Sequence, residues 1–362
     1  MRARTALMAA AALVAAVIAA TAVMCLGSGC SNIGYYAQSV SGHVDLMHRA
    51  RPVDSWLADD AAGDVLKHRL QLAQQMRAFS VHTLKLPDNA SYTSYADLQR
   101  PAAVWNVVAA PQLSLKLKTW CFPVTGCVGY RGYFDRGEAD ALAAQLRDEG
   151  WQAVVYGVPA YSTLGWTNWL GGDPLLNTFV NGSEGELARL IFHELAHQQV
   201  YAADDTPFNE SFATAVERIG LKLWFEQHGS AAAREQYREL ESRRRDFRHL
   251  TAQYRERLEA LYASDLDDDA KRQARDALMH DMRADHQRLK HGTWAGFAGY
   301  DRWFAAANNA ALGVLAAYTE WSDDFERLYV AQGRDFTRFY AEVARLAALP
   351  KAERHAVLQA LQ

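Results

Sequence analysis

The sequence predicts an α+β fold, in which a small, mostly antiparallel sheet is combined with mainly helical segments. Short runs with β-branched residues, or with alternating apolar and polar residues, are confined to residues 101–163. Apolar residues at helical spacing occupy the chain before and after that region. A block of strands flanked by blocks of helices is typical of the α+β class.

The first thirty residues indicate an export signal rather than part of the fold. Arg2 and Arg4 precede an apolar, alanine-rich run over residues 6–27, and Ser-Gly-Cys-Ser follows at 28–31. The segment resembles a bacterial lipoprotein signal, which implies that Cys30 carries the lipid of the mature protein. Because residues 6–27 are also long enough to span a bilayer, an uncleaved anchor is the alternative.

Either anchor places the body of the chain outside the cytoplasm. The lipoprotein alternative implies a membrane-anchored protein of the cell envelope that faces the periplasm, with the outer membrane as the favoured location. The formal net charge of −4 gives no reason to expect a nucleic-acid partner.

Half of the 362 residues are hydrophobic, so the chain can bury a sizeable core. We expect N-terminal helices and the core in residues 31–229, a helical hairpin arm in 230–292, and C-terminal helices packed on the core in 293–362. The expected helices before the sheet cover residues 35–50, 54–57 and 64–84. The expected strands cover residues 103–108, 113–118 and 152–156, with a helix over 135–149 between the last two.

Two cysteines, Cys121 and Cys127, lie six residues apart in this region. Since the export signal predicts an oxidising compartment, a disulfide closing a small loop is favoured over two free thiols. A metal site is the less favoured alternative, because no histidine or further cysteine lies nearby in the sequence.

A helix that carries a metal-binding motif is predicted to begin just after Ser183. Ser183 and Glu186, three residues apart, form a capping box. On this helix His193 and His197 lie on one face, so that both imidazoles can reach the same metal ion. We expect the helix to end near Asp204.

A second helix follows a short turn and adds carboxylates to this face. Thr206 is the expected cap, Pro207 takes the first-turn position that proline favours, and Gly229 is the expected C-terminal stop. Glu210, in the first turn, would lie beside the metal if the two helices pack antiparallel. Two histidines and one glutamate around an open position are the ligands of a catalytic zinc. Glu217 shares a helix face with Glu210 and competes with it as third ligand.

Glu194 lies about 100° around the first helix from His193. From there it can face a metal-bound water without being a ligand, which is the position of a general base. The alternative is a pair of buried, hydrogen-bonded core histidines. The capping signals and the downstream glutamate favour the zinc site over that alternative.

The segment from 230 to 292 is charged and helical. Its apolar residues at seven-residue spacing are Leu240, Phe247, Tyr254 and Leu261. Leu-Asp-Asp-Asp at 266–269 interrupts the pattern and a second helix extends to Lys290, so a helical hairpin is expected. The arginines at 243–245 indicate a solvated face rather than a phosphate site.

Residues 209–213 read Asn-Glu-Ser-Phe-Ala, with Glu217 four residues on. This resembles the Asn-Glu-Gly-Phe-Ala stretch of gluzincin aminopeptidases, although Ser211 replaces the glycine and the spacer from His197 is shorter. The resemblance implies that Glu210 binds the zinc. Glu217 and Asn209 would then contact the ligands and orient them without binding the zinc themselves.

The mature sequence as a whole resembles the family of predicted zinc aminopeptidases that occur as bacterial lipoproteins. The segments that carry the resemblance are 34–36, 120–123, 130–134, 158–163, the His193 motif, Asn209-Glu210 and 308–310. It implies a zincin-like core with one Zn²⁺ per chain and a peptide substrate. An edge strand at Ala160–Thr163 would hold the substrate backbone, and a tyrosine would stabilise the oxyanion. Tyr318 is the first candidate for that tyrosine, with Tyr300 and Tyr161 as alternatives.

An aminopeptidase must also recognise a free ammonium group, which requires a carboxylate partner once it is buried. The segment 157–165 carries no acid, so Asp173 or an acid of the helical arm is expected in that role. Three functions remain open: a zinc aminopeptidase, a zinc endopeptidase or other amide hydrolase of the envelope, and a non-catalytic scaffold or chaperone on a peptidase fold. Glu194 argues against the scaffold, which would need no general base.

Overall fold

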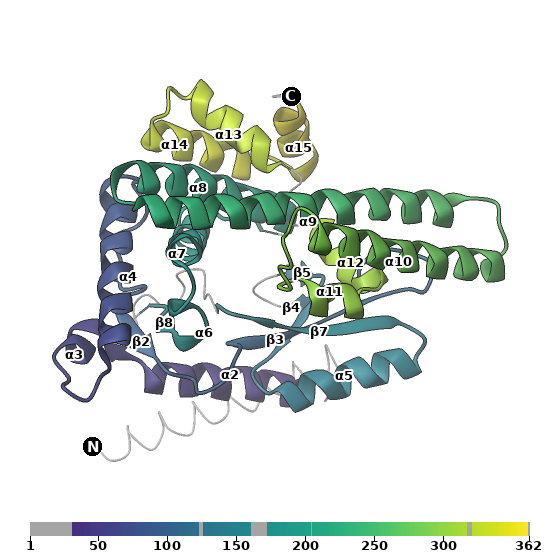
Figure 1. Cartoon of the computed structure of the whole chain (residues 1–362), viewed down its shortest axis with the longest axis horizontal. Helices are drawn as coiled ribbons and strands as arrows, with labels where there is room; N and C mark the ends of the chain where they lie inside the picture. The colour runs from purple at the N-terminus through teal and green to yellow at the C-terminus, as the bar shows by residue number, and fades with distance from the viewer. Residues whose placement is uncertain (1–30, 123–125, 161–171, 204, 317–320, 361–362) are drawn as a thin grey trace, which may run out of the picture. The chain divides into compact units, whose positions relative to one another are not determined.

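The computed structural model describes residues 31–122, 126–160, 172–203, 205–316 and 321–360 (Figure 1). The predicted signal with Cys30 lies outside the described residues, as do Tyr161 and Tyr318. The chain divides into two compact units, residues 1–48 and 49–362. Helix α2 (Ser31–Arg49) is the described element of the first unit. No helix within the described ranges has both the length and the apolar character that crossing a membrane requires.

The second unit is mainly helical and contains small, mostly antiparallel sheets, which confirms the predicted α+β class. Its helices are α3 (Val53–Leu57), α4 (Asp64–His82), α5 (Arg136–Asp148), α6 (Asn177–Val180), α7 (Glu184–Gln199), α8 (Thr206–Gln227), α9 (Ala231–Ala263), α10 (Asp268–His291), α11 (Asp301–Ala306), α12 (Asn309–Ala316), α13 (Ser322–Ala331), α14 (Phe336–Ala347) and α15 (Lys351–Gln359). Its strands are β1 (Arg51–Pro52), β2 (Ser94–Ala96), β3 (Val104–Ala110), β4 (Trp120–Phe122), β5 (Gly126–Val128), β6 (Arg131–Tyr133), β7 (Gln152–Val158) and β8 (Leu175–Leu176).

The main sheet has the order β6-β3-β7, and both pairings of β3 are antiparallel. The central strand β3 is buried on both faces, because Val107 and Val108 point to opposite sides and both are fully covered. Helix α12 covers one face, where Ala310 packs against Val108 and Ala110. Helix α5 also packs on β3 and β7, and Figure 1 shows it on the other side of these strands.

The expected strand at 113–118 is wrong. These residues form no strand, although the backbone N–H of Lys118 donates to the carbonyl of Ala109. The segment runs against α12 instead: a Cβ added to Gly313 would lie only 2.5 Å from the carbonyl oxygen of Leu115. The alternating apolar residues of this segment therefore contact helices rather than a neighbouring strand. Leu115 packs into the core of the arm.

Two smaller pairings complete the strands. The order β1-β2-β8 combines an antiparallel and a parallel pair. The hairpin β4–β5 pairs Cys121 with Cys127, and the two cysteines form a disulfide.

Helices α9 and α10 form the predicted hairpin arm. Its interior is a cluster of large apolar side chains, which includes Phe247, Leu250, Tyr254, Leu258, Met279 and Met282. Asp267 caps α10 by accepting a hydrogen bond from the backbone N–H of Ala270, so the acidic break in the sequence is the start signal of the second helix.

The C-terminal helices pack on α8. Phe208 and Phe212, one turn apart on α8, contact Phe325 of α13 at ring-centroid distances of 5.1 and 5.7 Å. Phe339 of α14 also lies 5.9 Å from Phe212. Aromatic pairs at this spacing bury a large apolar area, which fixes α8 from the side of the C-terminal helices.

Candidate metal centre

Helix α7 begins as its sequence predicts and ends earlier than expected. The hydroxyl of Ser183 accepts from the backbone N–H of Glu186, and the Glu186 carboxylate accepts from that of Ser183. The helix ends at Gln199 rather than near Asp204, because the backbone at Val200 is extended. His193 and His197 both lie in its last two turns.

Helix α8 is capped by Asp205 and not by Thr206, which corrects the predicted start by one residue. The Asp205 carboxylate accepts from the backbone N–H of Phe208, and Thr206 is the first helical residue. The turn from α7 is closed by Asn209, whose side chain both accepts from the N–H and donates to the carbonyl of Ala202, each at 2.8 Å. Asn209 therefore holds the two helices together one residue before Glu210.

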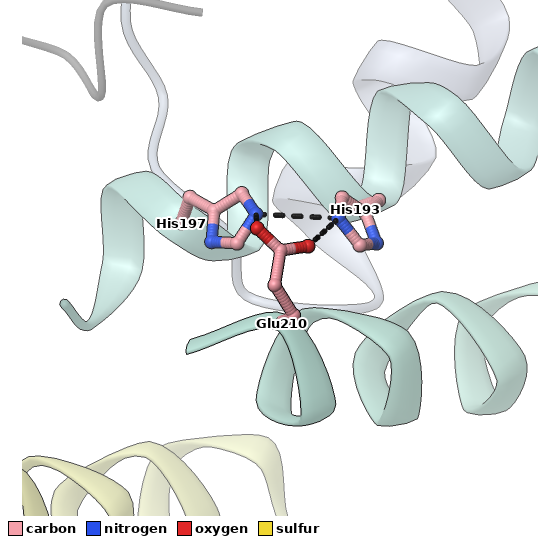
Figure 2. A group of neighbouring side chains, drawn as sticks. All are labelled: His193, His197 and Glu210. Carbon is pink, nitrogen blue, oxygen red and sulfur yellow. Dashed lines mark hydrogen bonds and ion pairs between the residues drawn. The ribbon is translucent and has the colours of Figure 1, made fainter. Parts of the chain in front are cut away.

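Three side chains converge between these helices (Figure 2). Nε2 of His193 lies 3.2 Å from Nε2 of His197 and 3.2 Å from Oε2 of Glu210. Nε2 of His197 lies 3.7 Å from Oε1 of Glu210. Of the residues that the structure describes, these three form the group of potential ligand atoms that could hold a metal ion.

The spacing fits a tetrahedral zinc ion. Two ligand atoms at about 2.0–2.1 Å from such an ion lie about 3.3 Å from one another. The His193–His197 and His193–Glu210 distances match that value. Without a cation, two ring nitrogens at this distance compete for one proton, so the donor set itself favours a metal ion in that position.

The charges of the site also favour a cation. Burial lowers the pKa of His193, but hydrogen bonds to Glu210 and Glu217 outweigh it and raise the pKa to about 10. Burial lowers the pKa of His197 to about 4. Burial raises the pKa of Glu210, but the neighbouring His197 and His193 bring it below its usual range. The anionic Glu210 therefore lies against the two Nε2 atoms, at a position that binds positive charge as a proton or as a metal ion.

Glu217 lies at the opposite nitrogen of the His193 ring. Its Oε2 is 3.0 Å from Nδ1 of His193, and its Oε1 accepts from Nη1 of Arg189 at 3.1 Å. Burial raises the pKa of Glu217, but Arg189 and His193 lower it to about 2. The carboxylate thus holds the Nδ1–H of His193 and leaves Nε2 to face the centre, as second partners of zinc-binding histidines do.

Glu194 is half-buried on the same helix. Its charge raises the pKa of Tyr92, after the larger effect of burial and together with Asp173. Tyr92 is a residue near the site that the sequence did not indicate. Its backbone has a φ of 64°, which is uncommon for a residue other than glycine and has no local sequence signature.

Asp173, the upstream acid expected to hold a substrate amine, is 2% exposed. Its backbone N–H donates to the hydroxyl of Ser91 at 3.2 Å, and its carboxylate accepts from Nε2 of Gln198 at 3.4 Å. Gln198 directly follows His197, so Asp173 lies beside the metal helix and is linked to it.

Of the three tyrosines expected as oxyanion stabilisers, the structure describes only Tyr300. Tyr161 and Tyr318 lie outside the described residues, as do residues 161–163 of the expected substrate strand. Tyr300 stacks on Phe247, with ring centroids 4.4 Å apart, in the apolar cluster of the arm. This contact places the Tyr300 ring in a packing role.

Comparison with known proteins gives one family. Neither the curated proteins nor the solved structures gave a match. The model of a family described as "Putative aminopeptidase" matches residues 34–358, from the first turn of α2 into the last turn of α15. Such a description points to a peptidase, in agreement with the two histidines and the glutamate that meet between α7 and α8. Because the match covers almost all of the chain, the protein belongs to this aminopeptidase family.

Proposed function

We propose that the protein is a zinc-dependent peptidase that holds one zinc ion with His193, His197 and Glu210. The observation that carries the proposal is the convergence of the two Nε2 atoms and the Glu210 carboxylate at the spacing of tetrahedral zinc ligands. A zinc ion held by these residues would lower the pKa of a water towards about 7 and would polarise the scissile carbonyl.

The remaining steps belong to the chain's own residues. Glu194 accepts the proton of the attacking water and then passes it to the leaving amine. Glu217 fixes the ring of His193 through Nδ1, and Arg189 keeps Glu217 ionised at neutral pH.

A peptide-substrate panel, assayed with and without a chelator, tests this function. We expect hydrolysis that stops on chelation and returns when zinc is added. Cleavage of esters or non-peptide amides alone would favour another hydrolase. A zinc-loaded protein that cleaves nothing would favour the scaffold.

We further propose that the enzyme trims peptides from the N-terminus, which is the finer statement that the family description carries. The ammonium group would then be held by Asp173 or by an acid of the arm. A matched pair of peptides, one with a free and one with an acetylated N-terminus, tests it. Strict dependence on the free amine is expected, and equal cleavage of both peptides would identify an endopeptidase.

We also propose that the protein is a lipoprotein of the cell envelope, attached to the membrane through Cys30. The observation behind it is the order of basic, apolar and small residues before that cysteine. Cys30→Ser should release the protein from membranes or leave an unprocessed precursor. Normal membrane attachment of this variant would contradict the proposal.

A further inference from the structure

The N-cap residue of α8, Asp205, is bound by residues near the C-terminus of the chain. Asp205 caps α8 five residues before Glu210, and its carboxylate is completely buried. A buried carboxylate needs partners that compensate for its lost hydration. Nη1 of Arg354 donates to Oδ2 of Asp205 at 2.6 Å, and Nε2 of His355 lies 2.9 Å from the same oxygen.

Arg354 also binds the end of α14. Its Nε donates to the carbonyl of Leu346, and its Nη2 donates to those of Ala347 and Leu349, at 2.8–3.2 Å. Its side chain is only 6% exposed. One guanidinium therefore ties the C-terminal end of α14 to the N-terminal end of α8, and a lysine could not satisfy these four acceptors at once.

A second tie reaches α8 on the other side of Glu210. The hydroxyl of Ser211, the residue after Glu210, accepts from the backbone N–H of Trp321 at 3.1 Å. The ring centroid of Trp321 lies 4.3 Å from that of His355. Asp205 and Ser211, which bracket Glu210, are thus both held by one set of C-terminal residues.

We propose that Arg354 and His355 are positioning residues for Glu210, so that the C-terminal helix α15 sets the zinc affinity of a site it does not touch. The inference rests on the proposed zinc site. A ligand has to be held within about 0.5 Å of its position to complete the coordination. A buried ion pair adds little to stability compared with apolar residues of similar volume. The role of the Asp205–Arg354 pair would instead be to fix the position of the first turns of α8, and with them Glu210.

The test is the zinc affinity of the full chain, measured by competition with a chromophoric chelator. We expect Arg354→Met to weaken zinc binding roughly tenfold or more, with an unchanged far-ultraviolet circular dichroism spectrum. Arg345→Met is the matched control, because Arg345 pairs with Glu342 inside α14 and is half-exposed. The control should keep its affinity within about twofold. His355→Phe, which keeps a ring against Trp321 and loses the contact with Asp205, gives a milder variant should Arg354→Met fail to fold.

A double variant separates positioning from mere stability. Asp205→Asn/Arg354→Met retains a capping side chain and leaves no buried carboxylate unpaired, so its thermal stability should recover relative to that of Arg354→Met. We expect its zinc affinity to remain low, because the link to α14 is still absent. Recovery of both quantities, or folded Arg354→Met and His355→Phe with wild-type affinity, would overturn the inference. Absence of zinc binding in the wild-type protein would instead overturn the proposed metal site.

Discussion

Two consecutive helical hairpins, α7–α8 and α9–α10, are held together in opposite ways. Small residues, including Ala188, Ala196, Ala213 and Gly220, are buried on α7 and α8. A Cβ on Gly220 would lie 2.9 Å from the ring of Phe192, so the helices approach closely there. The arm is instead filled by large side chains such as Phe247 and Leu258, and ion pairs line its exposed faces.

This difference in packing explains why the two hairpins carry their charged side chains in different environments. Close approach in the first hairpin brings Glu210 and Glu217 to the histidines of α7, where each carboxylate is paired. Glu217 is buried there and Glu210 is half-buried. Removing a member of such a network leaves a partner without compensation, which is costly. Ion pairs of the arm such as Glu239–Arg243 and Arg255–Glu259 keep one partner in contact with water, and each contributes little. We therefore expect replacement of polar residues to have the larger effects in α7–α8, and replacement of apolar residues to have the larger effects in the arm.

The largest expected effect is at Glu194. Glu194→Gln should lower kcat by about 10²–10⁴-fold, because the amide cannot accept the proton of the attacking water. Zinc content, measured by atomic absorption, should remain near one ion per chain, whereas His193→Ala should lose the metal. Glu226→Gln, on the exposed side of α8, is the matched control and should retain full activity. An active Glu194→Gln enzyme would remove this residue from the chemistry.

Leu258→Ala examines the apolar side of the comparison. Leu258 is fully buried in the arm, so the truncation should lower the free energy of unfolding by about 2–5 kcal/mol. Zinc affinity below the unfolding temperature should not change, because the arm cluster is separate from the ligands. Leu266→Ala, at an exposed position between α9 and α10, should have little effect on urea unfolding. A loss of zinc affinity in Leu258→Ala would show that the arm shapes the metal site.

Glu217→Gln separates a supporting carboxylate from a ligand. The amide keeps the volume but loses the charge that faces Nδ1 of His193, so zinc affinity should fall about 10–100-fold. Glu210→Ala should empty the site altogether. If Glu217→Ala empties the site and Glu210→Ala does not, the two glutamates have been assigned the wrong way round.

The smallest effect is expected at the rim of the arm. Glu239 pairs with Arg243 one turn away at 3.2 Å, and its side chain is 55% exposed. Glu239→Gln should therefore cost about 0.5 kcal/mol or less in thermal unfolding. A cost comparable to that of Leu258→Ala would mean that ion pairs, rather than the apolar cluster, hold the hairpin together.

The sequence by itself determined what short-range signals encode. The capping box of Ser183 and Glu186 set the start of α7, and the spacing of His193 and His197 set their common face. The seven-residue repeat and the acidic break predicted the arm and its turn. These features follow from the periodicity and caps of a helix, which depend only on residues a few positions apart.

Tertiary structure decided the rest. The alternation of apolar and polar residues at 113–118 could not distinguish a strand from an irregular segment lying against α12. Glu210 and Glu217 share a helix face, so their spacing alone could not separate their roles. The structure shows that the two carboxylates contact different nitrogens of His193, which the sequence could not indicate. Asp205 and Arg354, which are 149 residues apart, form their pair only when α15 folds back onto α8. Contacts of that kind leave no local pattern, because the residues that make them are neighbours in space alone.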